Sequence, residues 1–402
     1  MRTLLITDWM PGRGGMETHV TNVREGLRAA GDEVRLLTSS ASAEVEASPD
    51  YLAYGTERLA EQVLLQIVNP SAVARLRSAL REFQPDVVQV HTFAIHLSPA
   101  ILAPLRSVPT VLTVSDYKPV CPTSWKLLPD GSLCTEPAGL VCWRNGCTSL
   151  PHWLRDRPRY ALIHAGLRHV DRVLACSRSV QRELAVKGIA SEVLHLPVRA
   201  PGPDHRRTPA PEPVFVYCGR LSEEKGLALL LHSFSQLRHR APTARLRLVG
   251  TGPEQPRLER LVGELGLEEG VSFRGWLAPE AVERELVDAW ALVAPSLHAE
   301  PLGLVALEAL VRGVPVIASA GGGFAETVEE GVSGLLFPNG DGEALLRSLE
   351  SVAQRRVFPT QRIPDEVVRR VSEAHSLGRH VRLLRRICSD VIAASGARKV
   401  AS

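Results

Sequence analysis

The sequence predicts an α/β protein of two doubly wound domains, each a parallel sheet covered by helices on both faces. At 402 residues and 45% hydrophobic residues, the chain is longer than one core usually supports. Short apolar runs alternate with segments of helical period, and this alternation occurs twice. A proline-rich stretch without periodicity separates the two series. We therefore expect an N-terminal domain over 1–198, a linker over 199–213, a second domain over 214–370 and a helical segment over 371–402.

The expected strands are short runs rich in valine, leucine and isoleucine. In an open parallel sheet, ligands bind outside the carboxyl ends of the strands, so the loops that follow these runs are the candidate ligand loops. We expect strands at 2–8, 34–38, 86–91, 110–114 and 172–176 in the first sheet, and at 214–218, 245–249, 271–273, 291–294 and 314–318 in the second.

Charge and hydropathy exclude some classes of protein. The formal net charge of +3 is small and dispersed, which argues against a nucleic-acid partner. No apolar run reaches the roughly 18 residues of a membrane span, and the N-terminus enters a strand instead of a signal peptide. We expect a soluble, cytoplasmic protein. Because the chain has only five lysines, a lysine in a candidate site is informative.

The loop after the first strand is rich in glycine. Gly12, Gly14 and Gly15 precede a helix that we expect to begin near Met16. Such a loop lets backbone N–H groups approach a phosphate closely. A tight strand-to-helix turn without a ligand explains the pattern equally well, and the spacing is not that of G-x-G-x-x-G.

The second domain opens with a strand that is followed by two cations. In "VFVYCGRLSEEKG", Gly219 comes first and Arg220 and Lys225 follow. A guanidinium and an ammonium group at the carboxyl edge of a strand can hold a diphosphate between them. The alternative is a solvated Arg/Lys loop. Glycine-containing turns at 249–258 and 272–276 follow other strands of this domain and favour the diphosphate interpretation.

Two glutamates lie in the otherwise apolar segment "HAEPLGLVALEAL". Burying an unpaired carboxylate costs several kcal/mol, so Glu300 and Glu308 need compensation. We expect Glu300 in a loop, Pro301 in the first turn of a helix that runs from about Leu302, and Glu308 further along this helix. Ligand hydroxyls would satisfy both carboxylates. The alternatives are a helix-capping role for Glu300 and a partly exposed position for Glu308.

Together these motifs resemble the family-four retaining glycosyltransferases. "GRLSEEKG", "VGTGPE", "EPLGLVALEA" and "VPVIASAGGGFAETVEEGVSGLLFPNGD" are similar to the carboxyl half of that family, and "GRGGMETHV" to its amino half. The resemblance implies the GT-B fold, in which two Rossmann-like domains face a central cleft. It also implies transfer of a sugar, with retention and without a required metal cofactor, from a nucleotide-diphosphate sugar to an acceptor hydroxyl. UDP is the favoured carrier, while the sugar and the acceptor stay open.

The resemblance further implies roles for the candidate residues. Arg220 and Lys225 would hold the donor diphosphate. Glu308 would bind the nucleotide ribose and Glu300 hydroxyls of the donor sugar. Since no second carboxylate is placed as a covalent nucleophile, we expect departure and attack on the same face of the sugar. Backbone amides around Gly303 and Leu304, with the Gly14–Gly15 loop, would complete the diphosphate site.

One loop of the first domain departs from the family pattern. Family members carry histidine before an aspartate in this loop, whereas here Ser115 precedes Asp116, to which we assign a catalytic role. Ser115 can hydrogen-bond a sugar hydroxyl but cannot carry a positive charge. His91, at the end of the preceding strand, either substitutes for the missing histidine or is a buried, hydrogen-bonded residue.

Four of the seven cysteines, Cys121, Cys134, Cys142 and Cys147, lie within 27 residues. In a reducing cytosol such a cluster is more often a metal site than a pair of disulfides. The spacing is looser than in paired C-x2-C zinc modules, so structural thiols are an equal alternative and disulfides a third. The hypothesis is one structural zinc ion on the acceptor side.

The expected partners are a nucleotide-sugar donor and a hydroxyl acceptor, with weak peripheral membrane association and no nucleic acid. Two other functions stay open on the sequence. One is a nucleotide-sugar epimerase on the same architecture, and the other a non-catalytic nucleotide-sugar-binding protein, which Ser115 would favour.

Overall fold

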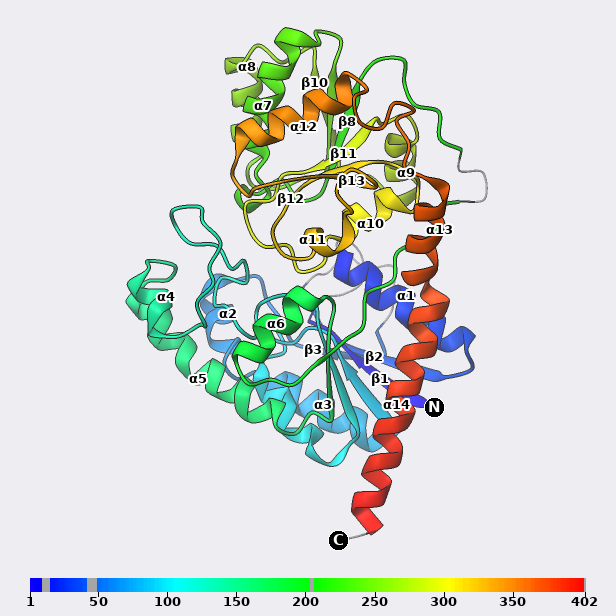
Figure 1. Ribbon diagram of the computed structural model, residues 1–402. Helices are drawn as coiled ribbons and strands as arrows, with labels where there is room; N and C mark the ends of the chain where they lie inside the picture. Colours follow the sequence, from blue (N-terminus) through cyan, green and yellow to red (C-terminus); the bar gives the residue numbers. More distant parts are fainter. Residues whose placement is uncertain (9–14, 42–48, 203–205, 401–402) are drawn as a thin grey trace. The chain divides into compact units, whose positions relative to one another are not determined.

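The computed structural model describes residues 1–8, 15–41, 49–202 and 206–400, and it confirms the α/β fold class (Figure 1). The chain forms two compact units, each built on a parallel sheet with interleaved helices. Unit 1 consists of Met1–Ser124, Glu136–Pro197 and Leu377–Ser402, and unit 2 of Trp125–Thr135 and Val198–Ser376.

Unit 1 contains a seven-stranded parallel sheet in the order β3-β2-β1-β4-β5-β6-β7. Leu4 of β1, an interior strand, pairs with Arg35 on one side and with Val88 on the other. All residues of β4 are buried, as expected for a strand covered on both faces. The strands are β1 (Arg2–Ile6), β2 (Glu33–Ser39), β3 (Tyr51–Ala53), β4 (Val87–Val90), β5 (Thr110–Val114), β6 (Arg172–Ala175) and β7 (Glu192–Val193).

The helices of unit 1 include the last helix of the chain, which packs against the first one. Val20, Val23 and Leu27 of the first helix share a core with Val381 and Leu384 of the last. The helices are α1 (Gly15–Ala29), α2 (Leu59–Leu65), α3 (Pro70–Phe83), the 3₁₀ helix η1 (Pro99–Ser107), α4 (Leu140–Arg144), α5 (Leu150–Leu167), α6 (Arg178–Val186) and α14 (Leu377–Val400).

Unit 2 contains a six-stranded parallel sheet in the order β10-β9-β8-β11-β12-β13. Its core includes Phe215 and Phe234, whose rings pack edge to face at 6.4 Å between centroids. The strands are β8 (Val214–Cys218), β9 (Arg245–Val249), β10 (Val271–Gly275), β11 (Ala291–Ala294), β12 (Val316–Ser319) and β13 (Gly334–Phe337). The helices are η2 (Glu223–Lys225), α7 (Leu227–Arg240), α8 (Gln255–Glu264), α9 (Pro279–Val287), α10 (Leu304–Leu310), α11 (Phe324–Thr327), α12 (Gly342–Ala353) and α13 (Asp365–Ala374).

The structure differs from the sequence expectation at three places. The short strands β3, β7 and β13 were not expected. Helix α10 begins at Leu304, so the expected start near Leu302 with Pro301 in the first turn is wrong. The reason is Gly303, whose φ of 79° lies in the left-handed region and whose absent Cβ leaves room for the Phe324 ring. The helical end is two helices, α13 in unit 2 and α14 in unit 1.

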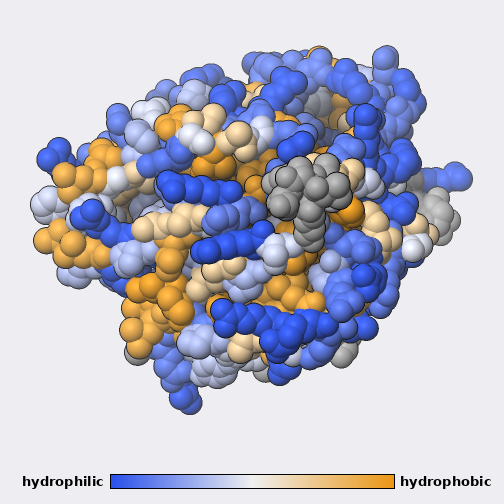
Figure 2. Space-filling model, turned by 90° about the horizontal axis from the view of Figure 1, so that it is seen from below, coloured by the Kyte–Doolittle hydropathy of each residue, from blue (hydrophilic) through white to orange (hydrophobic). Residues whose placement is uncertain are grey.

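Apolar and polar side chains alternate over much of the surface (Figure 2). In the part of the chain that the structure describes, no helix has the length and apolar character that crossing a membrane requires. Several large apolar side chains are nevertheless exposed, among them Leu64, Leu140, Trp143, Leu150 and Leu154.

Candidate functional site

The candidate site of unit 2 lies where two neighbouring strands end. β8 pairs with β11 in parallel, so their carboxyl ends meet at the same edge of the sheet. The loop after β8 carries Arg220 and Lys225, and the loop after β11 carries Glu300. The structure therefore brings together Lys225 and Glu300, which are 75 positions apart in the sequence.

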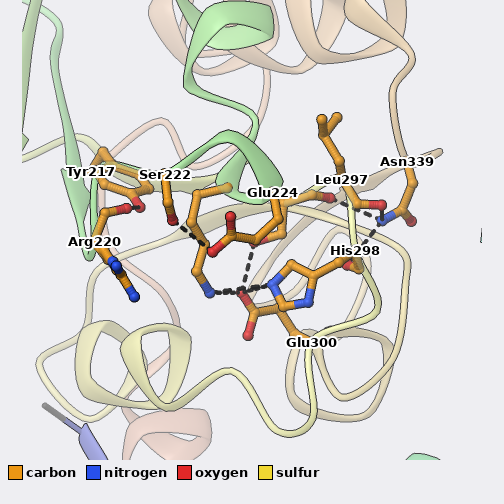
Figure 3. Close-up of polar contacts among 10 residues, drawn as sticks. Tyr217, Arg220, Ser222, Glu224, Leu297, His298, Glu300 and Asn339 are labelled. Carbon is orange, nitrogen blue, oxygen red and sulfur yellow. Dashed lines mark hydrogen bonds and ion pairs between the residues drawn. The ribbon is translucent and has the colours of Figure 1, made fainter. Parts of the chain in front are cut away.

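Glu300 is held by three side chains of unit 2, and all three contact its Oε1 atom (Figure 3). Lys225 Nζ donates to Oε1 at 2.5 Å, and Ser296 Oγ donates at 2.7 Å. His298 Nε2 lies 3.2 Å from the same oxygen and 3.3 Å from Lys225 Nζ. These contacts leave the second carboxylate oxygen, Oε2, outside the cluster.

The charge of Glu300 is compensated by the protein itself. Burial alone would raise the pKa of this carboxyl group, but the positive charge of Lys225 and the contact with His298 together hold the pKa well below its usual value. The expectation that ligand hydroxyls must compensate Glu300 is therefore corrected, because Lys225 does so without a ligand. Glu300 is an anion ready to accept hydrogen bonds at neutral pH.

Ser296 and His298 are site residues that the sequence analysis missed. Both are buried, and His298 Nδ1 has no hydrogen-bond partner among the residues that the structure describes. The sequence contains a signal that could have found them, since Ser296, His298 and Glu300 are polar residues that alternate with the apolar Leu297 and Ala299.

Asn339 holds the loop that carries this cluster. It follows β13, and its Nδ2 atom donates to the carbonyl oxygens of Ser296 at 2.9 Å, Leu297 at 3.2 Å and His298 at 3.4 Å (Figure 3). The backbone of Glu300 is fixed separately, because Gly323 N donates to its carbonyl oxygen at 2.6 Å. The position of the carboxylate is thus determined by contacts on both sides of it. Asn339 was not among the expected site residues, although it lies in the quoted "FPNGD" motif.

Arg220 differs from Lys225 in its surroundings. Its backbone is fixed, because Tyr217 Oη donates to the Arg220 carbonyl oxygen at 2.7 Å. Its side chain is exposed, and within the described ranges its guanidinium group forms no hydrogen bond or ion pair with the protein (Figure 3). This cation is therefore available to a ligand, whereas Lys225 is already shared with Glu300.

Glu308 lies on α10 in a different environment. Burial raises the pKa of its carboxyl group, and the charges of Arg312 and Arg199 oppose this rise without overcoming it. The same surroundings raise the pKa of the Cys218 thiol, chiefly through burial and then through the nearby Glu308 charge. Gly303 and Leu304 form the N-terminal boundary of α10, where backbone N–H groups lack partners within the helix.

In unit 1, Asp116 and Ser115 lie at the carboxyl end of β5. Asp116 accepts a hydrogen bond from Lys118 N at 2.9 Å. Burial raises the pKa of Asp116, although that hydrogen bond and the Lys118 charge act in the opposite direction. Ser115 is buried, and its Oγ atom has no hydrogen-bond partner among the described residues.

His91 is buried among other histidines. Its ring packs edge to face on His19 at 5.4 Å between centroids, and His19 packs in the same way on His380 of α14. Neither ring nitrogen of His91 has a hydrogen-bond partner in the described part of the chain, so it is buried but not hydrogen-bonded. Burial lowers the pKa of His91 to about 3. His91 is therefore a neutral side chain at physiological pH and does not replace the positive charge of the missing histidine.

Gly14 and Gly12 lie outside the residues that the structure describes, and Gly15 is the first residue of α1. Their phosphate role stays a prediction.

The four cysteines of the predicted metal site are divided between the two units. Cys121, Cys142 and Cys147 belong to unit 1, and Cys134 to the segment grouped with unit 2. Among the described residues, no three side chains of His, Cys, Asp or Glu are arranged to hold a metal ion. Cys121 Sγ lies 3.3 Å from Thr123 Oγ1, while Cys142 is buried within α4. A zinc site that includes Cys134 stays a prediction for elemental analysis.

Two family models match this sequence. The model for glycosyl transferases group 1 matches residues 203–366, and the model for Glycosyltransferase Family 4 matches residues 13–199. Together they cover most of the chain.

Curated relatives match either a part or most of the chain. A D-inositol 3-phosphate glycosyltransferase of Frankia alni is 41% identical over 141 residues, 32% of this chain and 33% of the relative. A GDP-mannose-dependent phosphatidylinositol monomannoside mannosyltransferase of Mycolicibacterium smegmatis is 37% identical over 33% of this chain and 36% of its own length. The chain thus spans about a third of these two relatives. Glycogen synthase of Mycobacterium tuberculosis is 28% identical over 85% of this chain and 84% of its own length.

Solved structures share the fold over nearly the whole chain. Sucrose-phosphate synthase of Thermosynechococcus elongatus has a TM-score of 0.76 at 24% identity and covers 98% of this chain and 99% of its own. Anabaena HepE, solved in complex with UDP, has a TM-score of 0.68 at 18% identity and covers 97% of this chain and 100% of its own. At these identities the likeness supports the two-domain GT-B fold and nothing finer.

Proposed function

Because the chain belongs to the group 1 glycosyltransferases, we propose that it transfers a sugar from a nucleotide-diphosphate sugar to a hydroxyl group of an acceptor. In this proposal the donor is a UDP-sugar and the anomeric configuration is retained. The observation that carries it is Glu300, a buried carboxylate that is kept anionic by Lys225 while its Oε2 atom lies outside the cluster. A charged acceptor of this kind suits sugar hydroxyl donors.

Arg220 and Lys225 bind the donor diphosphate in different ways. Arg220 is exposed and brings a full positive charge with paired N–H donors. The Lys225 ammonium group has three N–H donors, of which Glu300 engages one. The others are left for phosphate oxygens, so Lys225 can hold the sugar-binding carboxylate and the leaving group at once. These two cations, with the amides of Gly303 and Leu304, stabilise the departing diphosphate, and the transfer step needs no metal ion.

Glu308 binds the ribose, and Asp116 with Ser115 lies on the acceptor side. Ribose hydroxyls would donate to Glu308, whose raised pKa indicates that its charge lacks full compensation in the protein alone. The unpaired Ser115 Oγ is a hydrogen-bonding group that a sugar hydroxyl can satisfy.

The test begins with thermal unfolding in the presence of UDP, UDP-glucose, UDP-N-acetylglucosamine and GDP-mannose. GDP-mannose is included because the name of the Mycolicibacterium smegmatis relative specifies it as the donor. A ligand at about 100 times its Kd should stabilise the protein by about 2.7 kcal/mol. The proposed donor predicts stabilisation by UDP and a UDP-sugar, and stabilisation by the GDP compound alone would replace UDP with GDP.

A second assay separates transfer from the other two functions. Release of UDP only when an acceptor is present, with a product whose anomeric configuration is read by NMR, is the expected result. Conversion of the sugar nucleotide without an acceptor would indicate an epimerase, which the transferase relatives do not favour. Binding without turnover toward any acceptor in a broad panel would indicate a non-catalytic protein.

A further inference from the structure

Helices α4 and α5 each expose a pair of large apolar side chains. Leu140 and Trp143 of α4 are each 40% exposed, and Leu150 and Leu154 of α5 are 41% and 52% exposed. The members of each pair are three or four positions apart, so they lie on the same face of their helix. Apolar surface is visible at the left of Figure 2, on the side where Figure 1 draws these helices.

These exposed side chains belong to helices that are well fixed in unit 1. The indole Nε1 of Trp153 on α5 donates to the Gly139 carbonyl oxygen at the start of α4, at 3.0 Å. The other side of α5 is buried, where a Cβ on Gly166 would overlap Leu102 of η1. The apolar face is therefore a surface of the folded unit and not a loosely packed element.

The charges on this face all have one sign. Arg144 and Arg157 are exposed beside the apolar side chains, and Arg157 stacks over the Trp153 ring at 5.2 Å. Asp156 is the one acidic residue between positions 137 and 158, and it is buried with an ion pair to Arg155 at 2.9 Å. Within α4 and α5, the exposed charged side chains are thus arginines alone.

We propose that this α4–α5 face, formed by Leu140, Trp143, Arg144, Leu150, Leu154 and Arg157, docks on the surface of an anionic lipid bilayer. Leucine and tryptophan enter the boundary between headgroups and acyl chains, while arginine pairs with anionic phospholipids. A two-fold contact with a second copy fits less well, because it would bring these arginines together with no carboxylate on the face to pair with them.

A second apolar surface of unit 1 provides a matched contrast. Leu64, at the end of α2, is 72% exposed, but its neighbourhood carries Glu57 and Glu61, and Arg58 is paired with Glu61 at 3.4 Å. Exposure of an apolar side chain without surplus positive charge should not suffice for anionic lipid. Leu64→Gln is therefore the control for a general loss of apolar surface.

The test measures sedimentation of the full chain with vesicles of phosphatidylcholine alone and of phosphatidylcholine with about one third phosphatidylglycerol. Binding to the anionic vesicles, weakened by salt and much weaker with the neutral ones, is expected. Leu150→Gln with Leu154→Gln, and separately Arg144→Gln with Arg157→Gln, should each reduce the vesicle affinity about tenfold or more. Leu64→Gln should leave it unchanged.

Three outcomes would overturn the proposal. The first is equal binding to neutral and anionic vesicles. The second is that both double variants bind vesicles as well as the unchanged chain does. The third is self-association that depends on protein concentration and is abolished in the leucine variant, with no binding to vesicles. Far-ultraviolet circular dichroism and thermal unfolding confirm that each variant folds. Because vesicle binding is read without donor or acceptor, the result is independent of the proposed transferase activity.

Discussion

Each unit of the molecule contains a cluster of three titratable side chains, and the two clusters respond to burial in different ways. In unit 2, the buried Glu300 and His298 contact the partly exposed Lys225, so opposite charges lie side by side. In unit 1, His19, His91 and His380 pack ring against ring, and no carboxylate contributes to this stacking. The Glu300 carboxylate is compensated and stays ionised, whereas the histidine cluster avoids charge because burial lowers the pKa values of His19 and His91.

The difference shows that burial alone does not determine the protonation of a group. Burial disfavours the charged form everywhere, but a partner of opposite charge at hydrogen-bond distance can reverse the direction of the shift. Glu300 has such a partner in Lys225, and its pKa is lowered. Glu308 has no ion pair this short in the described structure, and its pKa is raised. A buried anion with a short ion pair is suited to a fixed electrostatic role.

The largest expected effect is acid destabilisation of unit 1. For His19 and His91 the folded pKa lies below the unfolded value, so the unfolded chain binds more protons and stability falls as the pH falls below about 6.5. Each histidine should cost about 2 kcal/mol of unfolding free energy between pH 7 and pH 5, or about 4 kcal/mol for both. Hydrogen exchange, measured at both pH values on peptides of each unit, checks this.

His91→Asn removes one of these titrating groups. The variant should lose about 2 kcal/mol of the acid destabilisation of unit 1 between pH 7 and pH 5, whatever its stability at pH 7. Peptides of unit 2 serve as the internal control, because the Glu300 cluster loses stability only at lower pH, below the usual glutamate pKa. An unchanged pH slope in the variant would contradict the assignment to the histidine cluster.

The next effect concerns Lys225→Met, which leaves Glu300 buried without its cation. Removing one partner of a buried ion pair costs about 3–5 kcal/mol, and the 24% exposure of the Lys225 side chain reduces the expected loss to about 2–4 kcal/mol. Urea unfolding at pH 7 measures it. The matched double variant, Lys225→Met with Glu300→Gln, should recover most of the loss, since no uncompensated charge remains. Equal losses in the single and double variants would show that Lys225 contributes packing and not charge compensation.

Asn339→Ala tests the support of the compensated cluster. The carbonyl groups of Ser296, Leu297 and His298 lose a shared donor, so we expect a loss of about 1–2 kcal/mol in stability. Under the proposed function, turnover should fall while UDP affinity is kept, because the carboxylate that binds the sugar moves and the diphosphate groups do not. Asn145→Ala changes an exposed asparagine of unit 1 and should alter neither quantity. A fall in UDP affinity equal to the fall in turnover would assign Asn339 a different role.

The sequence predicted the fold class and the loops that carry the site, but not the contacts inside it. The apolar runs identified most strands, and Gly219, Arg220 and Lys225 were correctly expected at the end of β8. The ion pair of Lys225 with Glu300 could not be predicted, because it joins loops of two strands whose adjacency is a property of the sheet order. His298 was overlooked because the sequence pattern does not distinguish a site histidine beside apolar residues from a buried structural one.

The apolar pattern of α14 also did not indicate to which unit this helix belongs. Its buried positions, Val381, Leu384, Cys388 and Val391, show helical spacing that would suit either sheet. In the structure, α14 belongs to unit 1 because it contacts α1 and because Arg385 forms an ion pair with Asp32 at 3.0 Å. Long-range pairings of this kind depend on the whole fold and leave no local signal.

The smallest expected effect on stability, and one of opposite sign, is that of Glu308→Gln. The pKa of Glu308 is raised in the folded state, so folding disfavours its charged form. The unfolding free energy of the Glu308→Gln variant should therefore rise by up to about 1 kcal/mol at pH 7 and stay unchanged in acid, where both states are protonated. Glu300→Gln, by contrast, should lose stability at pH 7. Under the proposed function, Glu308→Gln is the variant that harms UDP binding. It loses a charged ribose acceptor, which costs about 1.5–3 kcal/mol and weakens UDP binding about 10- to 100-fold. Glu300→Gln keeps UDP affinity and lowers turnover. Urea unfolding and UDP titration calorimetry on the two variants check both parts, and a destabilised Glu308→Gln protein would show that the two glutamates are compensated alike.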